Sequence, residues 1–169
     1  MKSIQVRHGQ DVQWIGDSSS LYPVVGLPPL NERAMQTILD IDDDKWDKYD
    51  FEDHPTMILN EEDVIEGMTQ LEPLDITLRW KGREIMPLIV NGEVYYIQVK
   101  YLKPYDDERL LTYYLRNDPA VASPIIGIQE GLCLAGLVMP IKMDDKVFCE
   151  TLYRVYEPTK REVYGGSEL

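Results

Sequence analysis

Residues 76–102 read ITLRWKGREIMPLIVNGEVYYIQVKYL, and this stretch decides the fold class. Its first apolar residues alternate with the period of a half-buried strand: Ile76, Leu78 and Trp80. A turn at Lys81-Gly82 then leads into a return strand over residues 83–90. Asn91-Gly92 follows, and this dipeptide is the strongest short signal for a two-residue hairpin turn. The stretch therefore predicts an antiparallel meander over residues 76–102.

The third strand of this meander follows the Asn91-Gly92 turn. Its alternating residues share one face: Tyr95, Ile97, Val99 and Tyr101. The middle strand contains Pro87, which has no backbone N–H to donate. Because an interior strand needs its donors on both edges, we expect Pro87 to mark a bulge or a place where one neighbouring strand has ended.

A second pair of strands is predicted near the C-terminal end. Residues 124–129 and 132–141 are rich in apolar residues and are separated by Glu130-Gly131, so they predict a hairpin over residues 124–141. Residues 110–116 fit a strand and a helix nearly equally. Their leucines alternate with Tyr113 as in a strand, yet they are also spaced by one helical turn.

Three segments have helical spacing. The first begins at the capping residue Asn31, the second begins at Asn60 and ends at Pro73, and the third begins at Asp144 or Asp145. The residues expected to face inward are Ala34, Met35, Ile38, Leu39 and Ile41 in the first helix, Val64, Ile65, Met68 and Leu71 in the second, and Val147, Phe148, Leu152, Val155 and Tyr156 in the third.

The remaining segments complete an α+β fold class. Residues 3–7 fit a strand, residues 16–20 read as a loop, and residues 21–30 are extended or looped because they contain three prolines. The prediction is an antiparallel sheet, made of the 76–102 meander and the 124–141 hairpin, packed with two to three helices. We expect one acidic domain over residues 1–156 and a frayed tail over residues 157–169.

Composition indicates a folded cytoplasmic protein. A chain of 169 residues with 44% hydrophobic content is the usual size of one domain and too apolar for disorder. The first residues form no apolar signal segment, and no run of eighteen apolar residues occurs, so no membrane association is expected. Cys133 and Cys149 are the only cysteines, and each falls in an apolar pattern where a reduced thiol usually packs.

The net charge of −13 is concentrated in one block. Residues 40–75 contain fourteen acidic and two basic residues, whereas the rest of the chain contains sixteen acidic and fifteen basic residues. Such a block attracts a basic protein partner and repels nucleic acid, so it predicts no direct nucleic-acid binding. Its most concentrated acids are Asp42, Asp43, Asp44 and Asp47. The alternative interpretation is a solvated face that only aids solubility.

No motif predicts a catalytic residue, a metal site or a cofactor. The spacing of Asp40, Asp42 and Asp44 matches the start of an EF-hand loop, but Lys45 and Phe51 then replace the required Gly and Glu. The two histidines, His8 and His54, have no metal-binding spacing. The chain also lacks a glycine-rich phosphate loop and a serine elbow. Function as an enzyme is therefore the least favoured class.

Several short motifs follow one another near the C-terminal end: residues 94–99, Tyr101-Leu102, Asp118-Pro119, Ser123-Pro124 and LVMPIK at residues 137–142. In this order they resemble the end of the third domain of bacterial DNA-polymerase sliding clamps. That family has a strand, a helix opening with Tyr-Leu, three strands and a terminal Met-Pro-hydrophobic-basic motif. The chain departs from the pattern at Pro104, which would shorten the helix, and continues for twenty-seven residues beyond Lys142. The resemblance covers residues 93–143.

This resemblance implies a site for a partner peptide. The peptide-binding cleft of the clamp family would correspond to Val138, Met139, Pro140, Ile141 and Ser123. Apolar side chains there would accept a hydrophobic anchor. The alternative is that residues 137–141 form a buried strand.

Three functions follow, in order of preference. The first is a non-catalytic protein-interaction or assembly module, related to sliding clamps if the resemblance holds. The second is an acidic decoy that mimics nucleic acid and binds a basic DNA- or RNA-binding protein. The third is an unrecognised enzyme. The sequence leaves the identity of the partner and the oligomeric state open.

Overall fold

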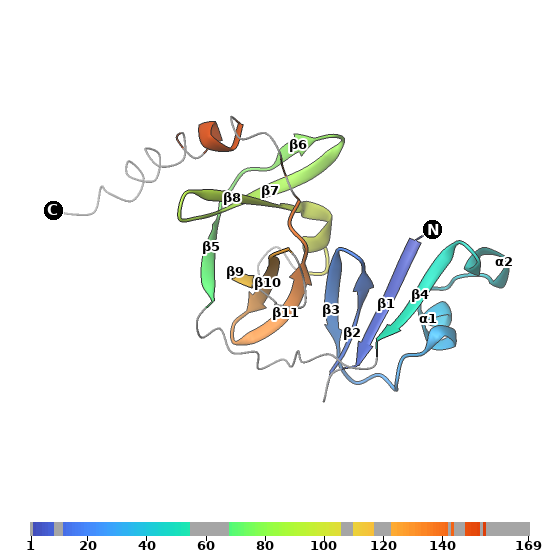
Figure 1. Cartoon of the computed structure of the whole chain (residues 1–169). Coiled ribbons are helices and arrows are strands. Elements are labelled where there is room, and N and C mark those ends of the chain that lie inside the picture. The colour runs from blue at the N-terminus through green and yellow to red at the C-terminus, as the bar shows by residue number, and fades with distance from the viewer. Residues whose placement is uncertain are drawn as a thin grey trace.

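The computed structural model describes residues 2–8, 12–54, 68–105, 110–116, 123–141, 143, 148–152 and 154. The fold is α+β, with a largely antiparallel sheet (Figure 1). The strands are β1 (Lys2–His8), β2 (Gln13–Asp17), β3 (Ser20–Val24), β4 (Tyr49–His54), β5 (Thr69–Pro73), β6 (Leu78–Trp80), β7 (Arg83–Val90), β8 (Glu93–Gln98), β9 (Leu111–Arg116), β10 (Ile125–Glu130) and β11 (Cys133–Val138). The helices are α1 (Glu32–Ile38), α2 (Asp43–Trp46) and the 3₁₀ helix η1 (Val99–Leu102).

One sheet runs through both parts of the molecule. Its order is β4-β1-β2-β3-β11-β10-β9-β5-β7-β6, and β8 pairs with the other edge of β7. All of these pairs are antiparallel except β1 with β4. The N-terminal sheet, which we define as β1 to β4, joins the rest of the molecule where β3 pairs with β11.

Six of the remaining strands, all except β6, close into a small barrel. β9 pairs with β5, β5 with β7 and β7 with β8, and the chain after β11 then returns to β8. There the backbone N–H of Ile141 donates to the carbonyl of Tyr96, with 2.6 Å between N and O. Because β11, β10 and β9 are also paired, six strands form a closed ring.

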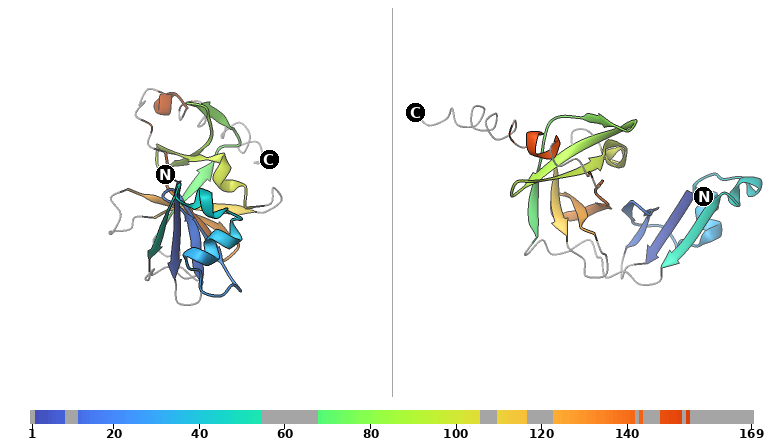
Figure 2. Two further views of the ribbon diagram at one scale, coloured as in Figure 1. Left: turned by 90° about the vertical axis from the view of Figure 1, so that its right-hand side faces the viewer. Right: turned by 45° about the horizontal axis from the view of Figure 1, so that its top comes forward.

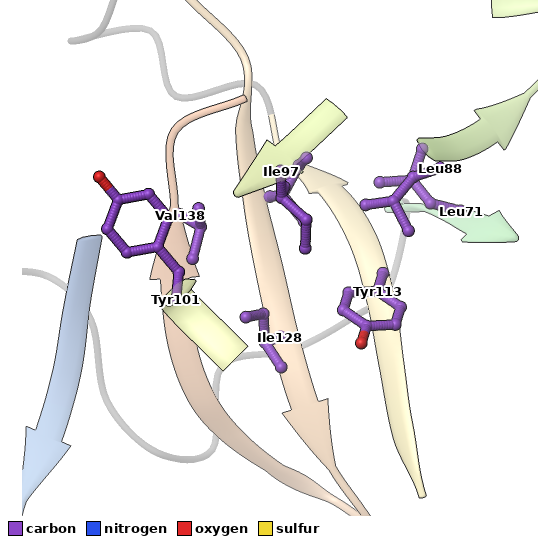
Figure 3. Close-up of a cluster of buried hydrophobic side chains, with 8 residues drawn as sticks. Leu71, Leu88, Ile97, Tyr101, Tyr113, Ile128 and Val138 are labelled. Carbon is purple, nitrogen blue, oxygen red and sulfur yellow. The ribbon is translucent and has the colours of Figure 1, made fainter. Parts of the chain in front are cut away.

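The barrel encloses the main core (Figure 3). Each of its six strands contributes a buried side chain, and η1 contributes another. These residues are Leu71, Leu88, Ile97, Tyr101, Tyr113, Ile126, Ile128 and Val138. Burial of large apolar side chains is the main favourable term in folding, so closure of the barrel and its stability are linked.

The N-terminal sheet is covered on both faces. One face packs against α1 and its preceding loop through Ile4, Val6, Leu30 and Met35. On the other face, the fully buried Trp14 packs with Leu134 and Leu137 of β11. Two tyrosines reinforce this junction: the Tyr22 hydroxyl donates to the Tyr101 carbonyl at 2.9 Å, and the Tyr105 hydroxyl donates to the Ala135 carbonyl at 2.8 Å.

The predicted meander is confirmed as β6, β7 and β8. Asn91 and Gly92 have φ values of 49° and 83°, as a two-residue turn of this kind requires. Pro87 lies where the pairing of β6 has ended at Ile85 and the pairing of β5 begins at Leu88, as predicted. The first strand begins later than expected, at Leu78, and the third strand ends earlier, because η1 begins at residue 99.

The predicted hairpin over residues 124–141 is also confirmed, as β10 and β11. Residues 110–116, which fitted both structures, contain the strand β9. Local spacing could not decide between them, whereas pairing with β5 and β10 does.

The second predicted helix is wrong in its last part. Residues 69–73 form β5, and Leu71 points into the barrel core instead of along a helix face. Pairing with β9 and β7 supplies hydrogen bonds and burial that outweigh the helical spacing. The beginning of that helix, from Asn60, lies outside the described residues.

Two predictions near the N-terminus need correction. The segment 16–20, expected to be a loop, contains the end of β2, a turn at residues 18–19 and the start of β3. In α1, Asn31 caps the helix through its side-chain oxygen, which accepts from the Ala34 N–H at 2.9 Å, and Met35 is buried as expected. Ile38 and Leu39, however, are exposed at the C-terminal end of this seven-residue helix.

The C-terminal predictions are covered only in part. Residues 148–152 and 154 are helical, consistent with the third predicted helix, but Phe148 is exposed instead of inward. Leu152 is partly buried, whereas Val147, Val155, Tyr156 and the predicted tail at residues 157–169 lie outside the described residues.

Candidate functional site

The acidic residues gather at one end of the N-terminal sheet. We define the acidic end as residues 40–53, which include α2 and most of β4 and contain eight acidic and two basic residues. Among the described strands, β4 is the last of the sheet on this side. Seven of the eight carboxylates are exposed: Asp40, Asp42, Asp43, Asp44, Asp47, Asp50 and Asp53. All four acids singled out from the sequence are therefore on the surface, within and beside one short helix.

An aromatic cluster fixes the acidic end to the sheet. Trp46 stacks on Tyr49 with ring centroids 5.9 Å apart and lies 6.5 Å from the ring of Phe51. Its indole N–H donates to Glu32 Oε1 of α1 at 2.7 Å. These aromatic residues among the carboxylates are the sequence signal that part of the acidic block packs. As a consequence, the carboxylates are held on a fixed framework instead of a loose loop.

Local interactions use only some of these carboxylates. Lys45 of α2 pairs with Asp42, which precedes the helix, and the side-chain amide of Gln36 donates to Asp43 at 2.7 Å. Two shallow, open hollows lie between α1 and α2, one of them bordered by Trp46 and Asp43. Open surfaces rich in carboxylates suit a cationic side chain better than a small molecule, which needs an enclosed cleft.

Of the five residues implied by the clamp resemblance, Val138 ends β11 where that strand pairs with β3, and Met139, Pro140 and Ile141 follow it towards β8. Val138 is fully buried in the barrel core. Met139, Pro140 and Ile141 are partly buried, and Ser123 is exposed. The Met139 N–H donates to the Ser19 carbonyl at 2.8 Å, so the N–H groups of Met139 and Ile141 are both used within the chain. A partner strand would thus find few free donors in this segment, and the cleft remains a prediction.

The two candidate surfaces are separate. Figures 1 and 2 place α2 and β4 at the outer end of the N-terminal sheet, while β11 and the chain after it lie beside β3 at the junction. The structure therefore does not combine the acidic residues and the 138–141 segment into one site.

The histidines and cysteines form no recognisable reactive site in the part of the chain that the structure describes. His8 Nε2 lies 3.1 Å from Asp53 Oδ1 and links β1 to β4. Cys133 is exposed next to a hairpin turn, which corrects the expectation that it packs, and Cys149 lies with its Sγ 3.4 Å from the Tyr96 hydroxyl. Among the described residues, no group of three or more His, Cys, Asp or Glu side chains is arranged to hold a metal ion.

The sequence predicted only a turn at Lys81-Gly82, but the hairpin around this turn also concentrates positive charge. The hairpin of β6 and β7 carries Arg79, Lys81 and Arg83, all of them exposed, beside Trp80. Residues 76–83 include these three basic residues and no acidic one, which is unusual in a chain of net charge −13. A local count of charge along the sequence would have revealed this.

No protein-family model, curated protein or solved structure matches the chain. The resemblance to the sliding-clamp domain therefore stays a prediction. Within the described residues, no helix is both long enough and apolar enough to cross a membrane.

Proposed function

We propose that this chain is a non-catalytic protein-interaction module that binds a basic partner through its acidic end. The observation that carries the proposal is the set of seven exposed carboxylates on α2, β4 and the residues beside them. A concentrated negative surface accelerates encounter with a positive partner and disfavours partners of like charge. The aromatic cluster beneath it limits the ordering cost of binding, because the carboxylates are already positioned.

The placement of these acids favours local docking over mimicry of nucleic acid. A decoy would spread its carboxylates along an extended face, as phosphates are spread along a backbone. Here the acidic run from residue 40 to residue 53 occupies one four-residue helix and one edge strand with their connections. That arrangement suits a compact basic patch on a folded partner.

A binding measurement with an octalysine peptide tests the proposal. Neutralising Asp42, Asp43, Asp44 and Asp47 to Asn should weaken binding about tenfold or more, because exposed charge pairs each contribute about 0.2–1 kcal/mol. Association should also slow, and affinity should fall steeply with salt. Fluorescence anisotropy and stopped-flow mixing measure these effects.

The matched control neutralises four exposed carboxylates elsewhere: Asp75, Glu84, Glu93 and Glu150. This variant has the same net charge as the test variant. If both variants lose the same affinity, binding depends on total charge and the acidic end is not a site. Binding that persists unchanged at high salt would also contradict the proposal.

A further inference from the structure

The hairpin of β6 and β7 presents a rigid basic surface. We call residues 78–84 the basic hairpin. Its turn residues Lys81 and Gly82 have φ values of 48° and 77°, which is the geometry of a tight two-residue turn. Lys81 Nζ lies 4.5 Å from the centroid of the Trp80 ring, so the aromatic residue and the cation form one surface. The Arg79 side chain is 79% exposed, and its Nη2 atom lies 3.9 Å from Glu84 Oε1, which makes a weak ion pair.

The basic hairpin and the acidic end occupy the two terminal strands of the same sheet. β6 ends the strand order on one side, and β4 ends it on the other. Both strands leave a row of backbone donors and acceptors unpaired with any described strand. Figures 1 and 2 show the β6–β7 hairpin and α2 apart from each other, so the opposite charges do not meet within one molecule.

We propose that the basic hairpin of one copy docks on the acidic end of a second copy, so that the chain assembles head to tail. This proposal rests on the proposed function, because it assigns the partner of the same acidic end. The two surfaces are complementary in charge and different from each other, which makes the contact heterologous. Repetition of such a contact gives a ring or an open chain of molecules.

Overall repulsion between two copies does not prevent this contact. At physiological ionic strength the screening length is about 8 Å, so the net charge of −13 acts weakly between distant parts of two molecules. Charges that meet across the contact lie within that length. The acidic end itself, with eight acidic and two basic residues, carries six of the thirteen excess negative charges, and the basic hairpin offsets part of them where the two surfaces meet.

A nucleic acid is the other class of partner that a basic hairpin with a tryptophan could bind. Three cations release few counterions from a phosphate backbone, and the strongly acidic remainder of the molecule repels it. The self-association of the chain is therefore the interaction that the charge distribution favours.

Sedimentation velocity of the full chain tests this inference. At about 0.15 M salt, where the screening length is about 8 Å, the average mass should rise with protein concentration, and at about 1 M salt, where the screening length is about 3 Å, only monomer should remain. Lys81→Glu with Arg83→Glu should weaken self-association about tenfold or more, and so should Asp43→Lys with Asp44→Lys. Mixing the two double variants should restore assembly, because each then supplies the charge that the other lacks.

The control reverses Lys100 and Lys103 to Glu, two exposed cations outside the hairpin, and should assemble as the unmodified chain does. Circular dichroism melting checks that every variant folds. A chain that stays monomeric at about 0.15 M salt but still binds octalysine overturns head-to-tail assembly and leaves the proposed function intact. If the unmodified chain neither self-associates nor binds octalysine, both head-to-tail assembly and the proposed function are contradicted. If the chain binds a DNA duplex through the basic hairpin and does not self-associate, the partner of the hairpin is nucleic acid and not a second copy of the chain.

Discussion

The barrel buries a core of eight residues drawn from all six of its strands and η1, whereas the helix-covered face of the N-terminal sheet buries four. Ring closure also removes most free strand edges from the barrel, leaving β6 as its outer strand. The N-terminal sheet instead ends on β4, an open edge lined with carboxylates, and charges on an edge discourage uncontrolled strand pairing. The larger core therefore supports the fold, while the smaller core supports the surface proposed to bind.

Truncation of the barrel core should give the largest effect. Leu88 is fully buried among side chains from neighbouring strands, so Leu88→Ala should lower the free energy of unfolding by about 4 kcal/mol through lost burial and a residual cavity. Urea unfolding followed by far-UV circular dichroism measures this. Leu132→Ala is the control, because Leu132 is 88% exposed and its loss should change stability by less than about 0.5 kcal/mol. A cost for Leu88→Ala below that of the control would show that the barrel is not the main core.

A smaller and more local effect is expected in the N-terminal sheet. Met35→Ala should cost about 2–3 kcal/mol, because the cluster around it is bordered by partly exposed side chains that can close the gap. Hydrogen exchange should show lost protection in β1 while β10 keeps its protection. Ile38→Ala on the same helix is the control, since Ile38 is 49% exposed. Equal loss of protection in both strands would mean that the two parts unfold as one unit.

The turn between β7 and β8 gives a third, smaller test. Gly92 has a φ of 83°, where a β-branched side chain is strained, so Gly92→Val should cost about 1–2 kcal/mol. Gly92→Asn should cost less, because Asn adopts positive φ more readily. Thermal unfolding of the two variants measures the difference. Equal melting temperatures would show that this turn does not need its backbone geometry.

The parts of the fold that were predicted correctly are those in which local signals agree. In the meander, alternation, turn residues and the position of Pro87 all indicate the same strands. The Asn31 cap and the Glu130-Gly131 turn are equally local. Where such local signals agree, the structure of a segment can be predicted without knowledge of the segments that it packs against.

The errors fall where distant partners decide. Leu71 has helical spacing with its neighbours, but pairing with β9, more than forty residues away in the chain, places it in a strand. The β2–β3 hairpin is hidden because Asp17 organises a serine turn: its Oδ1 accepts from the N–H groups of Ser19 and Ser20 at 2.8 and 2.9 Å. Neither barrel closure at Ile141 nor the parallel pairing of β4 with β1 has a local signal.

The residues of the candidate site could be predicted from the sequence, but their position in the fold could not. A charge count identifies Asp42, Asp43, Asp44 and Asp47, and the nearby aromatic residues predict that part of the block packs. The strand order, which has no local signal in the sequence, places these acidic residues at one end of the sheet. It also separates them from the 138–141 segment. The basic hairpin at the opposite end of the sheet can be identified only from the charge pattern and the strand order together.

The smallest expected effect concerns alkaline pH and the barrel surface. Desolvation and a 2.7 Å hydrogen bond from the Tyr95 hydroxyl to Glu93 raise the pKa of Tyr95 to about 12. Because this folded-state pKa lies above the ordinary value of 10, its contribution to stability is complete below pH 10 and is lost as pH rises through about 12. Tyr95→Phe should therefore show a smaller loss of stability over that pH range than the unmodified chain.

Glu93→Gln is the control for this prediction, because it removes the carboxylate but keeps the tyrosine. Desolvation remains, so the pKa of Tyr95 should fall only part of the way towards 10. Burial also raises the pKa values of Tyr105 and Tyr113 in the barrel and of Tyr22 at the junction, so their ionisation should follow that of exposed tyrosines. Absorbance at the tyrosinate band, read alongside urea unfolding at each pH, separates these groups. If Tyr95→Phe and the unmodified chain lose stability in parallel up to pH 12, the Tyr95–Glu93 hydrogen bond does not contribute to folding, and the alkaline transition belongs to the buried tyrosines alone.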